Sequence, residues 1–205
     1  MSVSPFGLPN RNDSAPSRFH YIDPEVIDTL SECLYQYFTQ VPPHKQIIFV
    51  CIGTDRSTGD SLGPLVGSNL QKYEFSGLHL YGTLDDPVHA MNLNETIDLI
   101  EQTYDSPFIV AIDACLGQLS SVGCITVAQG PVKPGAGVKK ELTPVGDMHL
   151  TGIVNVGGFM EYFVLQNTRL SVVMKMADII ARSIFRSMLK SRRITSFAAP
   201  AHNID

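Results

Sequence analysis

The sequence predicts an α/β protein with a mostly parallel sheet and helices on both faces. Solidly apolar runs at 47–53 and 107–117 lack the polar alternation of a strand that has one face in water. Segments with apolar residues at helical spacing stand between such runs. Because strands and helices alternate over short connections, we expect parallel strands joined by right-handed crossovers.

Length and composition favour one domain without a nucleic-acid partner. The chain has 205 residues, 44% of them hydrophobic, which is enough for one sizeable core. Its net charge is −5, whereas a nucleic-acid-binding protein usually carries a cluster of basic residues. No run is long and apolar enough for a membrane span or a signal peptide, so we expect a cytoplasmic protein. The four cysteines form no C-x-x-C pair and are expected as reduced thiols.

The domain boundaries follow from composition. Residues 1–18 are rich in Pro, Ser and Asn and are expected to be a flexible arm. A single α/β domain is expected over 19–190, followed by a tail over 191–205.

The order of elements can be read along the chain. The first half is predicted as helix 23–39 with Asp23 as its cap, strand 47–53, a helix from Asp60 or Ser61 to Lys72, strand 78–84 and a helix from Asn92 or Asn94 to Tyr104. The second half is predicted as strand 107–117, an antiparallel edge strand within 123–132, a loop at 133–140, a helix from Thr151 to Gln166, strand 169–174 and helix 175–190.

Polar residues gather where the predicted strands end. Ligands of open parallel sheets bind at the carboxyl ends of strands, where the strand order reverses. The loop after 47–53 carries Asp55 and Asp60, and its glycines have the spacing of neither a dinucleotide-binding loop nor a P-loop. Asp85 follows the next strand, either as a turn former or as a substrate contact.

Asp113 is the most informative residue, because five apolar residues precede it and an unpaired carboxylate there would be costly. We expect Asp60 and Asp113 to meet in a partly dry crevice, where one keeps a proton and the pair forms an acid–base couple. The alternative is a divalent metal between them, with His149 as third ligand. Asp60 as a helix cap and Asp113 as a turn former are the structural alternatives.

Two motifs resemble a known family. G-T-D-R-S-T-G-D-S-L-G-P (53–64) and A-I-D-A-C-L-G (111–117) resemble the sporulation family called spore protease YyaC. That family is similar to the germination protease of spore-forming bacteria and, more widely, to hydrogenase maturation proteases. The resemblance covers roughly residues 22–189 and implies a three-layer phosphorylase/hydrolase-like fold.

The resemblance also implies roles for individual residues. The germination protease has aspartates thought to be catalytic in D-x-L-G-P and I-D-A stretches, which here contain Asp60 and Asp113. Hydrogenase maturation proteases have an acidic residue at each point and add a His before a short helix. Here that residue is His149, and in that family the three groups bind the nickel of the substrate protein.

The implied function is a sporulation peptidase that uses the Asp60/Asp113 couple and requires no cofactor, with a divalent metal at Asp60, Asp113 and His149 as the alternative. Substrate contacts are expected at Gly53, Asp55, Gly59, Gly63 and Asp85, where the glycines would let a peptide backbone approach closely. The expected partner is a protein or peptide, with spore proteins as one class, in the cytoplasm of the sporulating cell or forespore. A metal-binding or non-catalytic peptide-binding protein is the alternative, and a homo-oligomer is left open.

Overall fold

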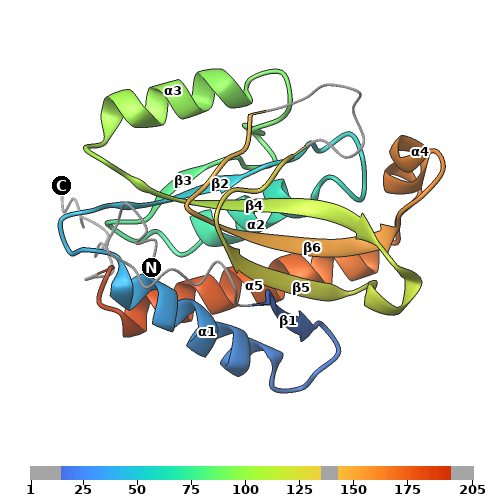
Figure 1. Ribbon diagram of the computed structural model, residues 1–205, viewed down its shortest axis with the longest axis horizontal. Helices are drawn as coiled ribbons and strands as arrows, with labels where there is room; N and C mark the ends of the chain where they lie inside the picture. Colours follow the sequence, from blue (N-terminus) through green and yellow to red (C-terminus); the bar gives the residue numbers. More distant parts are fainter. Residues whose placement is uncertain (1–14, 135–142, 195–205) are drawn as a thin grey trace, which may run out of the picture.

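The computed structural model describes residues 15–134 and 143–194, which form a six-stranded mixed sheet with flanking helices (Figure 1). The strands are β1 (Ser17–His20), β2 (Ile47–Cys51), β3 (His79–Tyr81), β4 (Phe108–Gly117), β5 (Cys124–Gln129) and β6 (Met148–Val156). The helices are α1 (Val26–Gln40), α2 (Leu62–Gln71), α3 (Leu93–Thr103), the 3-10 turn η1 (Leu119–Ser121), α4 (Glu161–Gln166) and α5 (Leu170–Lys190).

The sheet has the order β1-β5-β6-β4-β2-β3. Strands β3, β2, β4 and β6 pair in parallel, whereas β5 pairs antiparallel with β6 and with β1. From β2 the chain moves outward to β3 and then returns to β4 on the other side of β2. The strand order therefore reverses between β2 and β4, and this is where a ligand crevice is expected in an open sheet.

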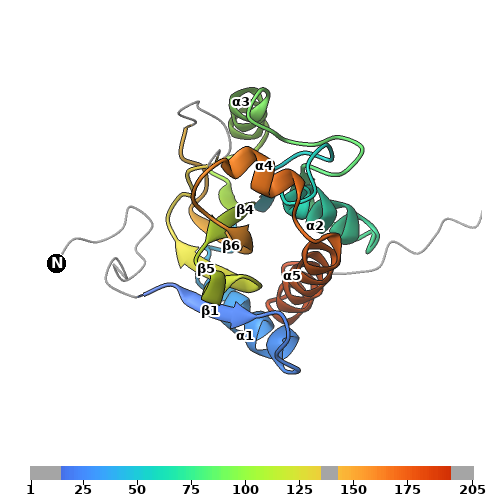
Figure 2. The same ribbon diagram turned by 90° about the vertical axis from the view of Figure 1, so that its right-hand side faces the viewer.

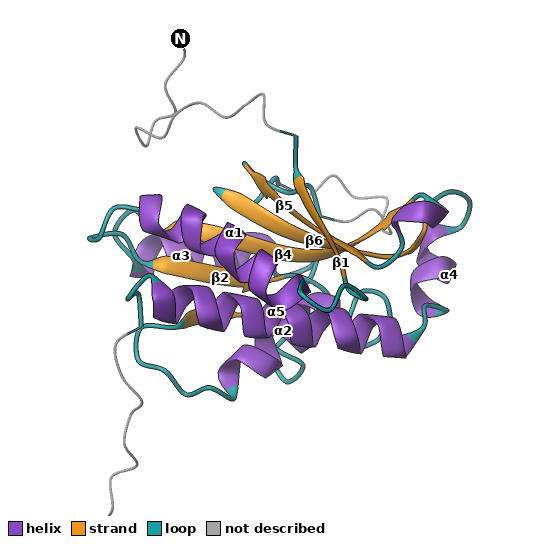
Figure 3. Cartoon of the chain, turned by 90° about the horizontal axis from the view of Figure 1, so that it is seen from below, coloured by secondary structure: helices purple, strands orange, loops and turns teal. Residues whose placement is uncertain are grey.

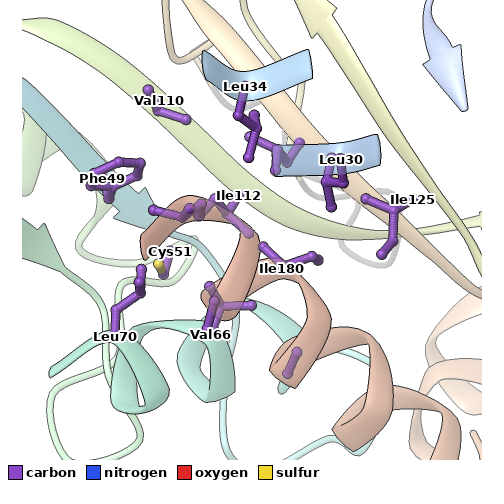
Figure 4. Packing of buried hydrophobic residues seen from close by; sticks show 14 of the residues in the cluster. Leu30, Leu34, Phe49, Cys51, Val66, Leu70, Val110, Ile112, Ile125 and Ile180 are labelled. Atoms are coloured by element: carbon purple, nitrogen blue, oxygen red, sulfur yellow. The ribbon is translucent and has the colours of Figure 1, made fainter. Parts of the chain in front are cut away.

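The larger core lies between the sheet and helices α1, α2 and α5, which share one face (Figures 1 and 3). In α1 the buried residues recur every four positions, so one stripe of the helix faces the sheet. Figure 4 shows side chains from α1, α2 and α5 meeting those of β2, β4 and β5. The labelled members of this cluster are Leu30, Leu34, Phe49, Cys51, Val66, Leu70, Val110, Ile112, Ile125 and Ile180.

A smaller core lies on the opposite face, under α3. There Leu93, Ile97 and Ile100 pack against residues of β2 and of the first half of β4. Helices on both faces make a three-layer α/β fold, as predicted. Among the described residues this second layer does not extend over β5 and β6, since neither core cluster contains the side chains that these strands direct to the α3 side.

Most elements between residues 23 and 117 confirm the sequence prediction. The strands predicted at 47–53, 78–84 and 107–117 and the three predicted helices are present, with ends shifted by a few residues. Asp23 does not cap α1, because the N-cap residue is Glu25 and the Asp23 carboxylate accepts the Glu25 N–H at 2.9 Å. The strand within 123–132 is antiparallel as predicted, but it is not at the edge, because β1 pairs outside it.

The helix predicted from Thr151 to Gln166 is wrong over most of its length. Residues 148–156 form β6, which lies between β4 and β5, and only the six residues of α4 are helical. The alternation of buried and half-buried positions from Met148 to Thr151 is that of a strand. Pairing on both sides outweighs the weak helical pattern of this segment.

The strand predicted at 169–174 is also wrong. Leu170 begins α5, a helix of 21 residues in which Val173, Ala177, Ile180 and Ile184 form a buried stripe. The β-branched pair before Met174 favoured a strand locally, but the stripe extends the helix through it.

Both ends of the domain extend further than predicted. Ser17 and Arg18, expected in the arm, belong to β1, and Ile194, expected in the tail, is buried. Arg193 donates hydrogen bonds to the carbonyl oxygens of four residues at the end of α1 and in the loop after it, namely Phe38, Val41, Pro42 and Lys45. The remaining parts of the predicted arm (1–14), loop (135–140) and tail (195–205) lie outside the described residues.

Candidate active site

The turn after β2 brings Asp60 back to the end of that strand. Gly53 has φ +148°, and a Cβ there would lie 1.9 Å from the carbonyl oxygen of Asp60. The same carbonyl accepts the N–H of Thr54 at 3.2 Å. Ser61, not Asp60, is the N-cap residue of α2. The Asp60 side chain is therefore not needed as a helix cap.

Asp113 lies in β4 where β2 has turned away. The N–H of Ile52 donates to the Ile112 carbonyl at 2.7 Å, but the next N–H, that of Gly53, donates to Val88 instead. The N–H of Ala114, which points to the same side of β4 as the Ile112 carbonyl, therefore loses its strand partner. The Asp113 Oδ1 accepts this N–H at 2.8 Å. Oδ2 is left as the oxygen that can carry a proton.

The two carboxyl groups influence each other. Asp113 is only 8% exposed, and burial together with the negative charge of Asp60 raises its pKa to about 8, against a smaller lowering by the Ala114 N–H. Burial also raises the pKa of Asp60, which is half-buried. At neutral pH Asp113 thus holds a proton, and Asp60 is the group that ionises first.

The glycines of the loop serve contacts within the chain. A Cβ at Gly63 would lie 2.1 Å from the Ile52 carbonyl oxygen, and one at Gly59 would lie 2.7 Å from the Leu165 side chain. Close packing against other segments of the same chain therefore explains why glycine occupies positions 53, 59 and 63. Their predicted contact with a substrate backbone stays a prediction that this geometry does not require.

Asp55 and Asp85 are exposed at the same end of the sheet. The Asp55 carboxylate accepts a long hydrogen bond from the Thr54 hydroxyl at 3.4 Å. Asp85 lies in a turn after β3, two strands away from β4, in which the Thr83 N–H donates to the Asp86 carbonyl. Both lie at the carboxyl end of the sheet, but neither lies beside Asp113, and their contact with a substrate stays a prediction.

His149 lies inside β6 rather than before a helix. It pairs with Ala111, so it lies two residues, or roughly 7 Å, nearer the amino end of the sheet than Asp113. Its Nδ1–H donates to the Gly130 carbonyl oxygen at 2.8 Å. Over residues 15–134 and 143–194, no three His, Cys, Asp or Glu side chains are grouped so as to hold a metal ion. The predicted set of Asp60, Asp113 and His149 is not assembled as a metal site.

Thr151, predicted only as the first residue of a helix, occupies the position beside Asp113 in β6. The two residues are register partners, and the Thr151 hydroxyl also hydrogen-bonds the Cys115 thiol. Burial raises the pKa of that thiol to about 11, so it is protonated and is not a nucleophile at neutral pH. Ser57, in the loop that carries Asp60, is buried, and its hydroxyl has no hydrogen-bond partner within the described part of the chain.

Helix α4 borders this loop beyond the ends of β4 and β6 (Figure 1). The N–H of Gly59 donates to the Leu165 carbonyl at 2.8 Å, which fixes α4 against the loop. Just before and within α4, four large apolar side chains are exposed: Phe159, Met160, Tyr162 and Phe163. A group of exposed apolar side chains is typical of protein-binding surfaces.

These features define an α/β protein with an open, mostly parallel sheet and a coupled pair of carboxyl groups at its switch point. The chain belongs to the family described as "Protein of unknown function (DUF1256)", whose model matches residues 18–183. It is 59% identical over 140 residues to the uncharacterized protein YyaC of Bacillus subtilis (strain 168), with 68% of each chain covered. The resemblance to the YyaC family is thus confirmed.

A search of solved structures finds a [NiFe] hydrogenase maturation protease, HycI, from Thermococcus kodakarensis KOD1. The match has a TM-score of 0.44 and 16% sequence identity, and it covers 71% of this chain and 93% of that one. Within the described residues, no helix has the length and apolar character needed to cross a bilayer.

Proposed function

We propose that this protein is a peptidase in which Asp113 is the general acid and Asp60 the general base. The observation that carries the proposal is the buried Asp113 carboxyl, whose proton is retained by burial and by the charge of Asp60. Two carboxyl groups with separated pKa values at a strand switch point are the arrangement that acid–base hydrolysis needs. The D-x-L-G-P and I-D-A motifs, which resemble those of the germination protease, support the same assignment.

The chemistry would proceed in two steps. Asp60 removes a proton from water while Asp113 donates its proton from Oδ2 to the carbonyl oxygen of the substrate, and the new C–O bond gives a tetrahedral intermediate. The C–N bond then breaks as Asp60 gives its proton to the leaving nitrogen and Asp113 takes back a proton from a hydroxyl of the intermediate. Both carboxyl groups return to their starting states, and no metal is needed in either step.

A protein or peptide is the substrate class that the surroundings favour. The exposed apolar side chains before and within α4 lie next to the loop that carries Asp60, where a polypeptide could bind them. We propose that it acts in the cytoplasm of a sporulating cell or forespore, which the resemblance to sporulation proteases supports, with spore proteins as the substrates to test first.

The test is cleavage of acid-soluble spore-protein extract and of a mixed peptide library by the purified full chain. We expect cleavage by the wild type, loss of at least about a hundredfold in rate for Asp113→Asn and Asp60→Asn, and little change for the control Asp105→Asn, which is exposed and lies before the amino end of β4. The rate should fall as the pH rises through about 8, because Asp113 loses its proton there.

Equal cleavage by wild type and Asp113→Asn would remove Asp113 from the mechanism. Absence of cleavage in both substrate sets, with the protein folded, would reject the peptidase and favour a non-catalytic peptide-binding protein that uses the same crevice.

A further inference from the structure

A row of four side chains crosses the sheet and ends at Asp113. Arg18 of β1 pairs with Thr126 of β5, Thr126 pairs with Thr151 of β6, and Thr151 pairs with Asp113 of β4. Residues paired across neighbouring strands point to the same side of a sheet. The four side chains therefore share one face, on the α3 side.

Within residues 15–134 and 143–194, no helix covers this face over β5 and β6. The side chains of α3 pack on β2 and on the first half of β4 only, and the described helices near β5 lie on the opposite side of the sheet (Figure 2). Thr126 and Thr151 are half-buried and belong to neither core cluster. Small polar side chains on a sheet face that no described helix covers leave room for a polypeptide to lie across it.

Arg18 supplies a positive charge at the far end of this row. It is exposed, and none of the ion pairs within the described residues involves it. Its charge extends toward the candidate site, since it lowers the pKa of Cys115 against the larger raising effect of burial, while the Asp113 charge raises that pKa. Arg18 and Asp113 thus act on Cys115 from one shared face.

We propose that this open face binds the substrate as an extended peptide, with the scissile bond at Asp113 and a peptide carboxylate held by Arg18. This inference rests on the proposed peptidase function and adds a substrate class to it. A guanidinium binds a carboxylate through paired hydrogen bonds. The exposed Asp55 and Asp85 stand at the carboxyl end of the sheet, outside this row, and would repel a carboxylate placed there instead.

The spacing of the row predicts where the carboxylate lies in the peptide. Arg18 and Asp113 are three strand spacings apart, or about 14 Å, and an extended peptide advances about 3.4 Å per residue. Four residues span that distance, and the long arginine side chain shortens it. We therefore expect the carboxylate about two to four residues from the scissile bond, either on an acidic side chain or at the C-terminus of the peptide.

The test uses decapeptides of alternating Ala and Thr, fluorescently labelled at the N-terminus, with one central Glu, Gln or Lys, each with a free or an amidated C-terminus. Fluorescence polarisation with the full chain should show the amidated Glu peptide binding about fivefold more tightly than the Gln peptide, as an exposed ion pair supplies. Arg18→Glu should abolish this preference and favour Lys. Lys175→Glu makes the same charge change at an exposed position of α5 and should leave the preference intact.

The free and amidated series separate the two carboxylate sources. If the C-terminal carboxylate is the ligand, the free-acid peptides bind more tightly whichever central residue they carry, and Arg18→Glu again removes the difference. A carboxylate preference that survives in Arg18→Glu, or wild-type protein that prefers neither carboxylate, would overturn the inference. Arg18→Gln, checked by its thermal midpoint, distinguishes loss of the charge from loss of folding.

The binding assay tests the peptide-binding face, and the cleavage assay tests the peptidase. Carboxylate binding that depends on Arg18, without any cleavage, would reject the proposed peptidase and keep the peptide-binding face. Cleavage that depends on Asp60 and Asp113 but is unchanged by Arg18→Glu would keep the peptidase and reject the peptide-binding face.

Discussion

Replacing Asp113 with Asn should change how the stability of the protein depends on pH. Burial and the Asp60 charge raise the Asp113 pKa from 3.8 to about 8 in the folded state. The folded protein therefore binds one more proton than the unfolded chain between these values, and the free energy of unfolding must fall as the pH rises through this window. An asparagine of the same shape does not titrate, so Asp113→Asn lacks this contribution.

The size of the effect follows from the pKa difference. Within the window, one titrating group changes stability by about 1.4 kcal/mol per pH unit. Between pH 5 and pH 7 the wild type should lose roughly 3 kcal/mol relative to Asp113→Asn. Above pH 8 the difference should level off, because Asp113 is then ionised in both states.

Urea unfolding of both proteins at pH 5, 6, 7, 8 and 9 measures this difference directly. Asp60→Asn is the matched control variant. Removing the Asp60 charge should lower the Asp113 pKa, so the free energy of unfolding should stop falling at a lower pH than in the wild type. Parallel stability curves for wild type and Asp113→Asn would refute the reasoning, because Asp113 would then titrate in the folded protein as it does in the unfolded chain.

Three further predictions concern the frame of the site. Gly63→Ala should destabilise the protein by about 3 kcal/mol, because its Cβ would meet a backbone carbonyl at 2.1 Å, whereas Gly157→Ala, with its nearest contact at 3.4 Å, should be mild in urea unfolding. Arg193→Ala should cost about 2 kcal/mol through its lost carbonyl hydrogen bonds, and exposed Arg192→Ala should cost less. Calorimetric titration with zinc, nickel or manganese should give the same heat for wild type and His149→Ala, since the described residues contain no group of three metal ligands.

The sequence was sufficient to predict the sheet centre and the acidic pair. β2 and β4 are buried on both faces, so their apolar runs are continuous and cannot be mistaken for surface segments. Asp113 interrupts such a run, and Asp60 follows the other one after a glycine-rich turn. Both signals are local, and the general rule for open sheets then predicts that the two residues meet.

The parts that failed depend on pairing between distant segments. β1 is four residues long and is a strand only because β5 pairs with it over a hundred residues later. β6 contains Gly152, and a Cβ there would meet the Leu62 side chain at 2.3 Å, so a glycine that weakens a local strand pattern is required by helix packing. Neither partner is visible in a window of ten residues.

The positions of His149 and Thr151 show that strand register determines which side chains surround Asp113. The sequence drew attention to His149, because histidine has the richer chemistry. Every second residue of a strand lies on the same face, so His149 and Thr151 share a face. The strand register decides which of them lies beside Asp113, and it selects Thr151. The same register aligns Arg18 with Asp113 across four strands. The strands that sequence patterns miss, β1 and β6, are therefore the ones that determine what surrounds the acidic pair.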